Sequence, residues 1–453
     1  MSTVSNGRNA GGDAYTGRSY TGRFDFLIVG AGVVGAVMAG LLLARKLVEP
    51  GRVAVIGEGA AAAASRQTVP VQALTIPESE WDTRVFALSR ASQRVLEICG
   101  TWVALPAQKR CAYERMCVWD AGTPAGRGDV PMPGALNFDC AVLGEPNLGF
   151  IVEGRALQAE CRRAAAAAGA VFIEATLQDV VVADSHVRVR LNDGRELQGQ
   201  LLIGADGADS TTRALLGIGT AGHAYHQDAV VAHVRTERPH RSTAWQRFLP
   251  TGPLAFLPLP DDRSSIVWST TRAEASRLRA LDAAFGAAVT AASDGVLGAC
   301  KLTTAVASFP LKLQYALDYV SPRAVLVGDA AHSVHPLAGQ GLNLGLMDCA
   351  SLVDVLGGGM VAGMRGMGYT GEHRLLRRYE RWRRSENLLA AAAMDGLERL
   401  FASDNSLVVH LRSAGLKSIG NLPFIKRELI ERALGLSGDV AGFLFAKADL
   451  ASR

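Results

Sequence analysis

The sequence predicts an α/β protein in which a parallel sheet with flanking helices is combined with a second, mainly antiparallel sheet. An apolar run at 24–29 leads into glycines and then helix-forming residues at 36–47, and another apolar run follows at 52–56. By contrast, residues 227–270 contain short strand-like pieces separated by Gly and Pro. Strand-helix-strand alternation favours a parallel sheet, whereas closely spaced strands with turn residues favour an antiparallel one.

Composition excludes several classes of protein. A chain of 453 residues that is 49% hydrophobic can bury a large core and form two or three structural units. The net charge of +4 is spread along the chain, so nucleic-acid binding is not indicated. Seven cysteines without C-x-x-C pairs predict neither disulfides nor a metal site, and we expect a cytoplasmic protein. No apolar run reaches the length of a membrane span.

The pattern along the chain suggests two interleaved domains. Strand-like residues flank the turn at Asn192-Asp193-Gly194, which predicts a hairpin there. The boundaries we expect are a disordered tail at 1–23, an α/β domain made of 24–105, 148–214 and 306–400, an antiparallel domain made of 106–147 and 215–305, and a C-terminal helical region at 401–453.

A G-x-G-x-x-G motif stands between the first predicted strand and its helix. Gly30 permits a tight turn, Gly32 lets a pyrophosphate approach the backbone, and Gly35 lets helix and strand pack closely. The helix N-terminus would face the phosphates. This context predicts a Rossmann-like dinucleotide site; an ordinary glycine-rich turn is the alternative.

The acidic partner of that motif is displaced. A carboxylate that binds the adenosine ribose is expected directly after the second strand, but Gly57 occupies that place and Glu58 follows it. Glu58 is therefore either the ribose ligand or a solvated loop residue.

Two later segments also deliver a carboxylate from a strand to a turn. In the first, an apolar strand ends at Asp206 and Gly207. In the second, a strand ends at Gly328 and Asp329 and leads to Gly339 and Gly341. Asp329 could bind a polyol hydroxyl, and the glycines would let the backbone approach a planar ring. A helix beginning nearby would favour negative charge on that ring.

These segments resemble the flavin aromatic-ring hydroxylases of group A, and among them the UbiH/UbiF/VisC hydroxylases of ubiquinone biosynthesis. The resemblance covers nearly everything after Phe24. It is carried by GAGVVG, DTRVFALSRASQRVLE, LGFIVEG, GADGADSTTR, GPLAFLPLP and, most specifically, GDAAHSVHPLAGQGLNLG. It implies a p-hydroxybenzoate-hydroxylase-like fold with an FAD-binding α/β domain and an inserted antiparallel substrate domain.

The resemblance also implies cofactor roles for individual residues. Gly30, Gly32 and Gly35 would bind the ADP half of FAD, and Arg84 would contact the flavin. Asp206 and Gly207 belong to the Asp-Gly motif shared by FAD and NAD(P)H binding, and Asp329, after Gly328, would hold the ribityl chain. The segment that would line the isoalloxazine ring contains Pro336, Gly339, Gly341, Leu342 and Asn343.

The activity implied is hydroxylation of a polyprenyl phenol or quinol ring through a flavin hydroperoxide, with NAD(P)H as electron donor and O2 as co-substrate. The VisC-like branch, which hydroxylates the first open position beside the phenol hydroxyl, resembles this chain most. Hydroxylation elsewhere on the ring, or a non-catalytic flavin-binding subunit, are the alternatives. Partners would be other ubiquinone-biosynthesis proteins, and the protein would contact the inner membrane peripherally, if at all.

Several other residues have both a functional and a structural interpretation. His332 and His335 are interpreted as packing or cofactor contacts rather than as a base or metal pair. Tyr225, Gln227 and Trp268 are candidates for a substrate pocket, although aromatic residues on such strands usually belong to the core. Residues 407–450 form either an interfacial element or an amphipathic helix packed on its own domain.

Overall fold

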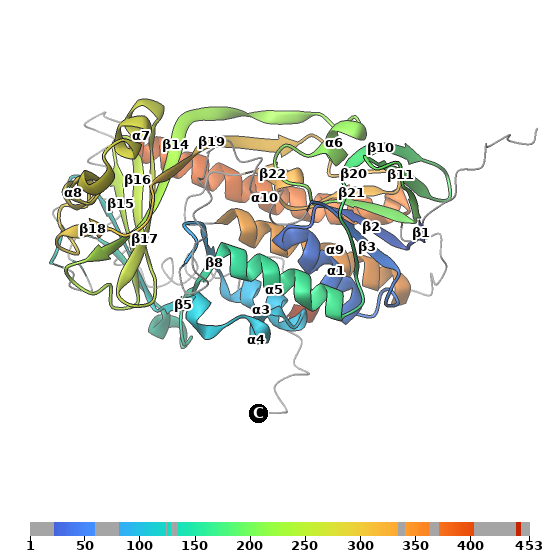
Figure 1. Ribbon diagram of the computed structural model, residues 1–453, viewed down its shortest axis with the longest axis horizontal. Helices are drawn as coiled ribbons and strands as arrows, with labels where there is room; N and C mark the ends of the chain where they lie inside the picture. Colours follow the sequence, from blue (N-terminus) through green and yellow to red (C-terminus); the bar gives the residue numbers. More distant parts are fainter. Residues whose placement is uncertain are drawn as a thin grey trace, which may run out of the picture.

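The structure is a computed structural model, and two lobes are joined side by side in it (Figure 1). One lobe contains a mostly parallel sheet with helices, and the other contains a large antiparallel sheet capped by two short helices (Figure 1). The residues it describes are 22–58, 81–123, 125–127, 132, 135–333, 340–361, 371–402 and 441–444.

The first lobe is built on a six-stranded sheet of order β20-β21-β13-β2-β3-β9, parallel except at β20. Its strands are β2 Phe26–Val29, β3 Val53–Ile56, β9 Val171–Ile173, β13 Leu201–Gly204, β20 Val320–Ser321 and β21 Ala324–Leu326. The helices of this lobe are α1 Val33–Ala44, α3 Arg90–Ile98, α4 Thr101–Ala104, α5 Gly154–Ala167, α6 Thr211–Leu215, α9 Gln340–Val361 and α10 His373–Ala402.

The glycine motif lies where β2 leads into α1. All four residues of β2 are buried, because one face of the sheet packs on the helices and the other on a smaller sheet. The helix begins at Val33, three residues earlier than predicted, because Gly32 is already its extended N-cap. Ten of the twelve α1 residues are buried, so this helix is fixed against the sheet. The motif therefore lies at the carboxyl end of central strands, where parallel sheets bind ligands.

The second lobe is a nine-stranded sheet of order β22-β19-β14-β17-β16-β15-β6-β7, with β18 also paired to β14. All its pairings are antiparallel except that of β15 with β6. The long strands β14 and β19 run between the two lobes (Figure 1). Its elements are β6 Arg115–Asp120, β7 Leu136–Asp139, β14 Thr220–Thr236, β15 Thr243–Leu249, β16 Gly252–Pro258, β17 Arg263–Thr271, β18 Cys300–Leu302, β19 Ala307–Ala316, β22 His332–Ser333, α7 Arg272–Arg279 and α8 Phe285–Ala292.

Two small sheets complete the fold. One has the order β4-β8-β5, and the other β1-β12-β11-β10. The hairpin predicted at Asn192-Asp193-Gly194 is confirmed, since β11 and β12 pair on either side of it. The strands are β1 Gly22–Arg23, β4 Val85–Leu88, β5 Arg110–Tyr113, β8 Gly149–Glu153, β10 Leu177–Val182, β11 Val187–Leu191 and β12 Glu196–Gly199.

The structure describes only part of the two chain ends for which we made predictions. Gly22 and Arg23, which we placed in the disordered tail, pair with Leu197 and Gln198 as a short strand. The rest of that tail and most of the C-terminal region lie outside the described residues. We retain the predicted domain division as a proposal, with one adjustment: β5 pairs with β8 of the α/β portion, so a boundary at 105 would divide a sheet.

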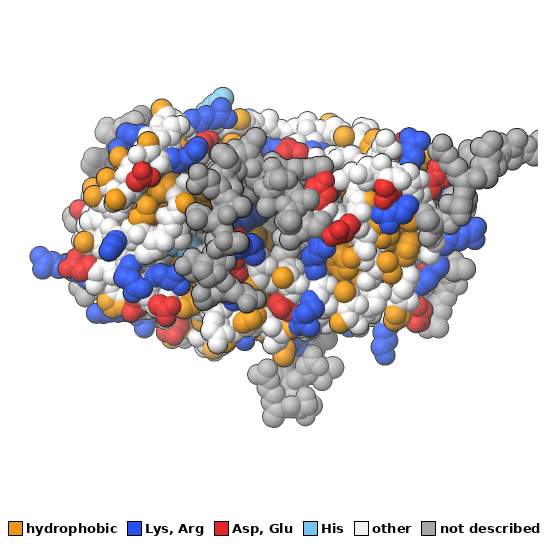
Figure 2. All heavy atoms as spheres, viewed as in Figure 1, with side chains coloured by type: hydrophobic (Ala, Val, Ile, Leu, Met, Phe, Trp, Pro, Cys, Tyr) orange, Lys and Arg blue, Asp and Glu red, His pale blue; other side chains and the backbone are white. Residues whose placement is uncertain are grey.

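The molecular surface shows no single-sign field on the face in Figure 2, where acidic and basic side chains are interspersed. In the described ranges, no helix has both the length and the apolarity that a membrane crossing requires.

Candidate cofactor and substrate site

The three glycines of the motif differ in their surroundings. A Cβ on Gly30, whose φ is +112°, would lie 2.2 Å from the Ala205 carbonyl oxygen, and one on Gly35 would lie 1.9 Å from the Gly30 oxygen. A Cβ on Gly32 would meet nothing within 4 Å. Gly30 and Gly35 are therefore required by the protein's own packing, whereas the space at Gly32 is open. No side chain caps the N-terminus of α1, so its N–H groups face that space.

Glu58 is displaced by one residue because of a close contact. A Cβ on Gly57 would lie 2.7 Å from the backbone nitrogen of Ala31, inside the glycine motif. The strand must therefore end in glycine there. Arg162 of α5 donates to the carbonyl oxygens of Ala31 at 3.4 Å and of Glu58 at 3.5 Å. It links the two loops that flank the dinucleotide space.

Asp206 holds its own turn together. Its carboxylate accepts hydrogen bonds from the Ser210 hydroxyl at 2.5 Å and from both the backbone and the hydroxyl of Thr212 at 2.8 and 3.0 Å. Gly207 follows at a φ of +82°, which favours glycine. Arg213, which lies beside Thr212 on helix α6, donates to the Ala330 carbonyl oxygen at 2.9 Å. The segment that begins at Asp206 is thus tied directly to the segment that contains Asp329.

Asp329 lies opposite the first turn of α9. Its Oδ1 is 3.9 Å from where a Cβ on Gly341 would stand. The side chain is reached by solvent but sits in a recess with protein on its other sides, and burial raises its pKa. The charges of His332 and Arg84 oppose that rise. Gly328, at a φ of +61°, makes the turn that delivers this carboxylate.

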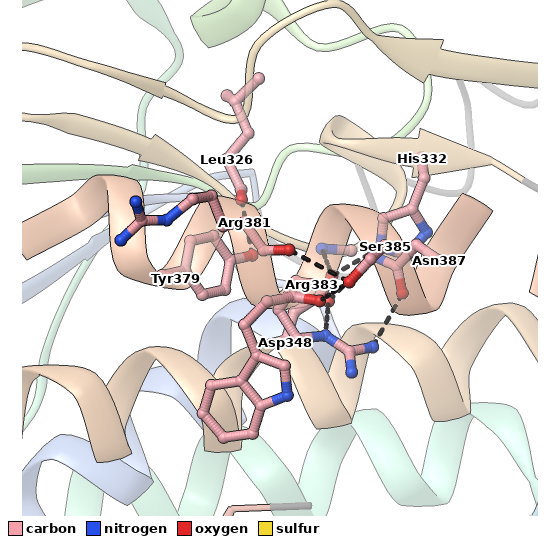
Figure 3. A network of polar contacts seen from close by, with 10 residues as sticks. Leu326, His332, Asp348, Tyr379, Arg381, Arg383, Ser385 and Asn387 are labelled. Carbon is pink, nitrogen blue, oxygen red and sulfur yellow. Dashed lines mark hydrogen bonds and ion pairs between the residues drawn. The ribbon is translucent and has the colours of Figure 1, made fainter. Parts of the chain in front are cut away.

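A buried polar network supports the Asp329 turn from behind, and sequence reasoning missed it (Figure 3). Asp348 of α9 is fully buried and accepts from His332 Nε2 at 2.6 Å, the Gly328 backbone N–H at 2.9 Å and Arg383 Nε at 2.7 Å. Asn387 of α10 donates to it as well, at 3.2 Å. Burial would raise the pKa of Asp348, but the charges and hydrogen bonds of His332 and Arg383 lower it to about 2.

The predicted ring-lining segment is only partly described. Pro336, Gly339 and also His335 lie outside the described residues. The Asn343 side chain is fully engaged, because it accepts from Ser89 N at 3.0 Å and Ser92 Oγ at 2.6 Å and donates to the Ala87 oxygen at 2.8 Å. Its side chain thereby anchors the start of α9 to the segment 87–92. Leu342 packs against the main core.

A cavity of about 400 Å³ lies between the nine-stranded sheet and the α/β portion. Arg84 and Lys312 line it, and no carboxylate is found among its lining residues in the described part of the chain. The sheet contributes mostly small or apolar side chains: Ala229, Val231, Ala244, Pro253, Ala255, Leu257 and Val267, together with Gln246, Ser265 and Ser269. Such a wall suits a flat apolar ligand.

The predicted pocket residues do not line this cavity. Trp268 is buried in the core on the opposite face of the sheet, because neighbouring residues on a strand point to opposite faces and Val267 faces the cavity. This cavity therefore gives no support to the predicted pocket role of Trp268. Tyr225 and Gln227 lie where β14 is irregular, between Ala224 and Asp228, and neither lines the cavity.

Two titratable groups adjoin the cavity. Burial raises the pKa of Tyr113, which lines it, to about 12. His233 lies on the same face of β14 as Ala229 and Val231 and is fully buried. Burial first, and then the charge of Arg263, lower its pKa to about 4, against a raising effect of the Thr83 backbone. Neither ring nitrogen meets a partner at full hydrogen-bond geometry.

A family model and several curated relatives match the chain. Residues 158–391 match the model described as FAD binding domain. The 3-demethoxyubiquinol 3-hydroxylase of Escherichia coli is 32% identical, covering 89% of this chain and 98% of that protein. The ubiquinone hydroxylase UbiL of Rhodospirillum rubrum is 35% identical, covering 91% and 89%. The mitochondrial ubiquinone biosynthesis monooxygenase of Rattus norvegicus is 32% identical, covering 92% of each.

Solved structures share the fold. The p-nitrophenol 4-monooxygenase of Pseudomonas putida superposes with a TM-score of 0.70 at 16% identity, covering 92% of this chain and all of that one. A probable FAD-dependent monooxygenase of Pseudomonas aeruginosa gives 0.63 at 22% identity, covering 87% of this chain and all of that one. The predicted fold class is confirmed.

Proposed function

The chain belongs to the FAD-dependent monooxygenases that include the ubiquinone-biosynthesis hydroxylases, and from this premise we propose that it hydroxylates the ring of a polyprenyl phenol at the first open position beside the phenol hydroxyl. The observation that supports an aromatic substrate is the cavity wall, which consists mainly of small, apolar side chains on one face of a sheet. A planar ring can pack on such a wall, while a prenyl tail must continue beyond a cavity of about 400 Å³.

The residues present fit FAD. Open space at Gly32, beside the uncapped N-terminus of α1, suits an anionic pyrophosphate. Glu58 stands beside the same loop and would bind the adenosine ribose, with Arg162 positioning it. Asp329 would bind the ribityl chain near the first turn of α9.

When bound, FAD supplies the redox chemistry that transfers one atom of O2 to the ring, with NAD(P)H as the electron donor. The protein's own groups orient the substrate and shield the site. The N-terminus of α9 and the guanidinium of Arg84 favour negative charge in the recess that Asp329 borders. The sheet walls one side of the cavity off from solvent, and at neutral pH Tyr113 beside it stays protonated because its pKa is about 12.

A second candidate is hydroxylation at another position of the same ring. It is favoured by the relative named 3-demethoxyubiquinol 3-hydroxylase, whose substrate already carries ring substituents. In either case the prenyl tail requires access from a membrane or a lipid-presenting partner, and we propose peripheral contact with the inner membrane.

The ring position is tested by deleting the gene and identifying the accumulated quinone intermediate by mass spectrometry. We expect a polyprenyl phenol that lacks every added ring oxygen. A methoxylated intermediate would contradict the first candidate and support the second. Restoring the gene must remove the intermediate, whereas a gene that encodes Gly32→Val, which fills the proposed pyrophosphate space, must not.

A further inference from the structure

Gln246 is a polar side chain in the middle of the apolar cavity wall. It lies on β15 and lines the cavity, and only 7% of its surface is exposed. Its amide makes no hydrogen bond within the described part of the chain. The amide opens onto the cavity rather than being enclosed by protein. A ligand that fills the cavity and offers this amide no partner would lose about 1–3 kcal/mol, so a ligand with a matching polar group is favoured there.

The neighbours of Gln246 define where that ligand lies. Across the sheet it is in register with Ala255, Ala255 with Val267, and Val267 with Val231. These side chains share one face, so they form a flat apolar strip across four strands. With about 4.8 Å between strands, the strip is longer than an aromatic ring. A ring packed on it would present its edge to the Gln246 amide.

The polar side chains of the cavity wall indicate which chemical group of the ligand lies beside Gln246. An amide offers a donor and an acceptor together, which a hydroxyl matches with its own O–H and lone pairs. A carboxylate would be attracted instead to Arg84 and Lys312. The hydroxyl of Ser265 is also unpaired, but it is enclosed by protein, whereas the Gln246 amide, in register with the apolar strip, opens onto the cavity.

We infer that Gln246 binds the free hydroxyl of the substrate ring and so restricts the enzyme to phenols and quinols, rejecting their ring ethers. This inference rests on the proposed function, since it concerns the same cavity. Gln246 orients the ring by its hydroxyl and thereby determines which carbon is presented for oxidation.

The test compares a short-chain 2-prenylphenol with its O-methyl ether. Their affinities for the FAD-loaded protein are measured by the change that each causes in the flavin absorbance spectrum. We expect the wild-type protein to prefer the phenol about tenfold, the value of one hydrogen bond. Gln246→Leu should bind both compounds within about twofold of one another, with its affinity for the ether retained. Gln198→Leu, the same change on β12 and remote from the cavity, should keep the tenfold preference.

The outcomes are separable. Binding of neither compound by the wild-type protein would overturn the proposed function. Equal binding by the wild-type protein, or a preference that survives Gln246→Leu, would overturn the role of Gln246 alone. Retained affinity for the ether in the variant shows that the cavity is intact, so misfolding cannot imitate the expected result.

Discussion

Replacing Asp348 by asparagine tests whether the buried network holds the cofactor turn. In the wild-type protein each carboxylate oxygen accepts two donors: Arg383 and Asn387 on one oxygen, and His332 and the Gly328 N–H on the other. An amide has one oxygen and one NH2 group, so on one side a donor must face a donor. The Arg383 charge, 4% exposed, would also lose its counter-charge.

The magnitude follows from two estimates. A pKa of about 2, against a usual value near 4, corresponds to about 2.5 kcal/mol of stability in favour of the ionised carboxylate. Removing one partner of a buried ion pair costs about 3–5 kcal/mol. We therefore expect Asp348→Asn to lower the free energy of unfolding by about 3–5 kcal/mol, and to weaken FAD binding because the Gly328 turn loses its anchor.

The assay is urea unfolding followed by circular dichroism, with FAD affinity measured by flavin fluorescence. Asp354→Asn, a partly exposed position on the same helix, is the matched control and should change stability by less than about 0.5 kcal/mol. Because the pKa of Asp348 is depressed in the folded state, its contribution is complete above about pH 4 and is lost as the pH falls toward 2. An Asp348→Asn protein as stable as wild type at pH 7 would refute this reasoning.

Three further predictions concern the turns and the sheet. Gly32→Ala should fold normally but bind FAD weakly, whereas Gly35→Ala should lose stability even without FAD, because its Cβ would meet the Gly30 oxygen. Thermal melts with and without FAD separate the two effects. Equal melting temperatures for the two variants in both conditions would contradict the assignment. The pKa of His233 is about 4 in the folded protein, below its usual value, so the unfolded chain binds the proton more strongly. The free energy of unfolding should therefore fall by about 3 kcal/mol between pH 6.5 and 4. Urea titrations of His233→Phe over this pH range should show a smaller fall. Asp206→Ala should cost about 2–4 kcal/mol by loss of three hydrogen bonds in urea unfolding, and no loss would show that the turn is held otherwise.

Local spacing explains which parts of the site were predictable. Gly35 is required by Gly30, five residues away, so the motif itself places the helix contact and the open space at Gly32; the contact of Gly30 with the distant Ala205 carbonyl could not be read from the motif. The displaced Glu58 was also visible, but its reason was not, because Gly57 is required by contact with a loop 26 residues earlier in the chain.

The network around Asp348 depends on distant segments and could not be predicted. Its partners lie 16 to 39 residues away and meet only when α9 packs on α10. The available signal was an otherwise apolar helical run with two acidic residues, Asp348 and Asp354, and nothing in it marked Asp348 as the buried one. The face of the nine-stranded sheet was equally hidden: both faces of β17 are buried, so strand periodicity could not decide between Val267 and Trp268.

The most direct test of the central claim is isotope labelling. The purified protein, loaded with FAD, is given NAD(P)H, a short-chain 2-prenylphenol and ¹⁸O2, and the product is analysed by mass spectrometry and NMR. We predict one heavy oxygen atom on the ring carbon beside the phenol hydroxyl. Oxidation of NAD(P)H that yields only hydrogen peroxide, or a product whose new oxygen comes from water, would contradict the account.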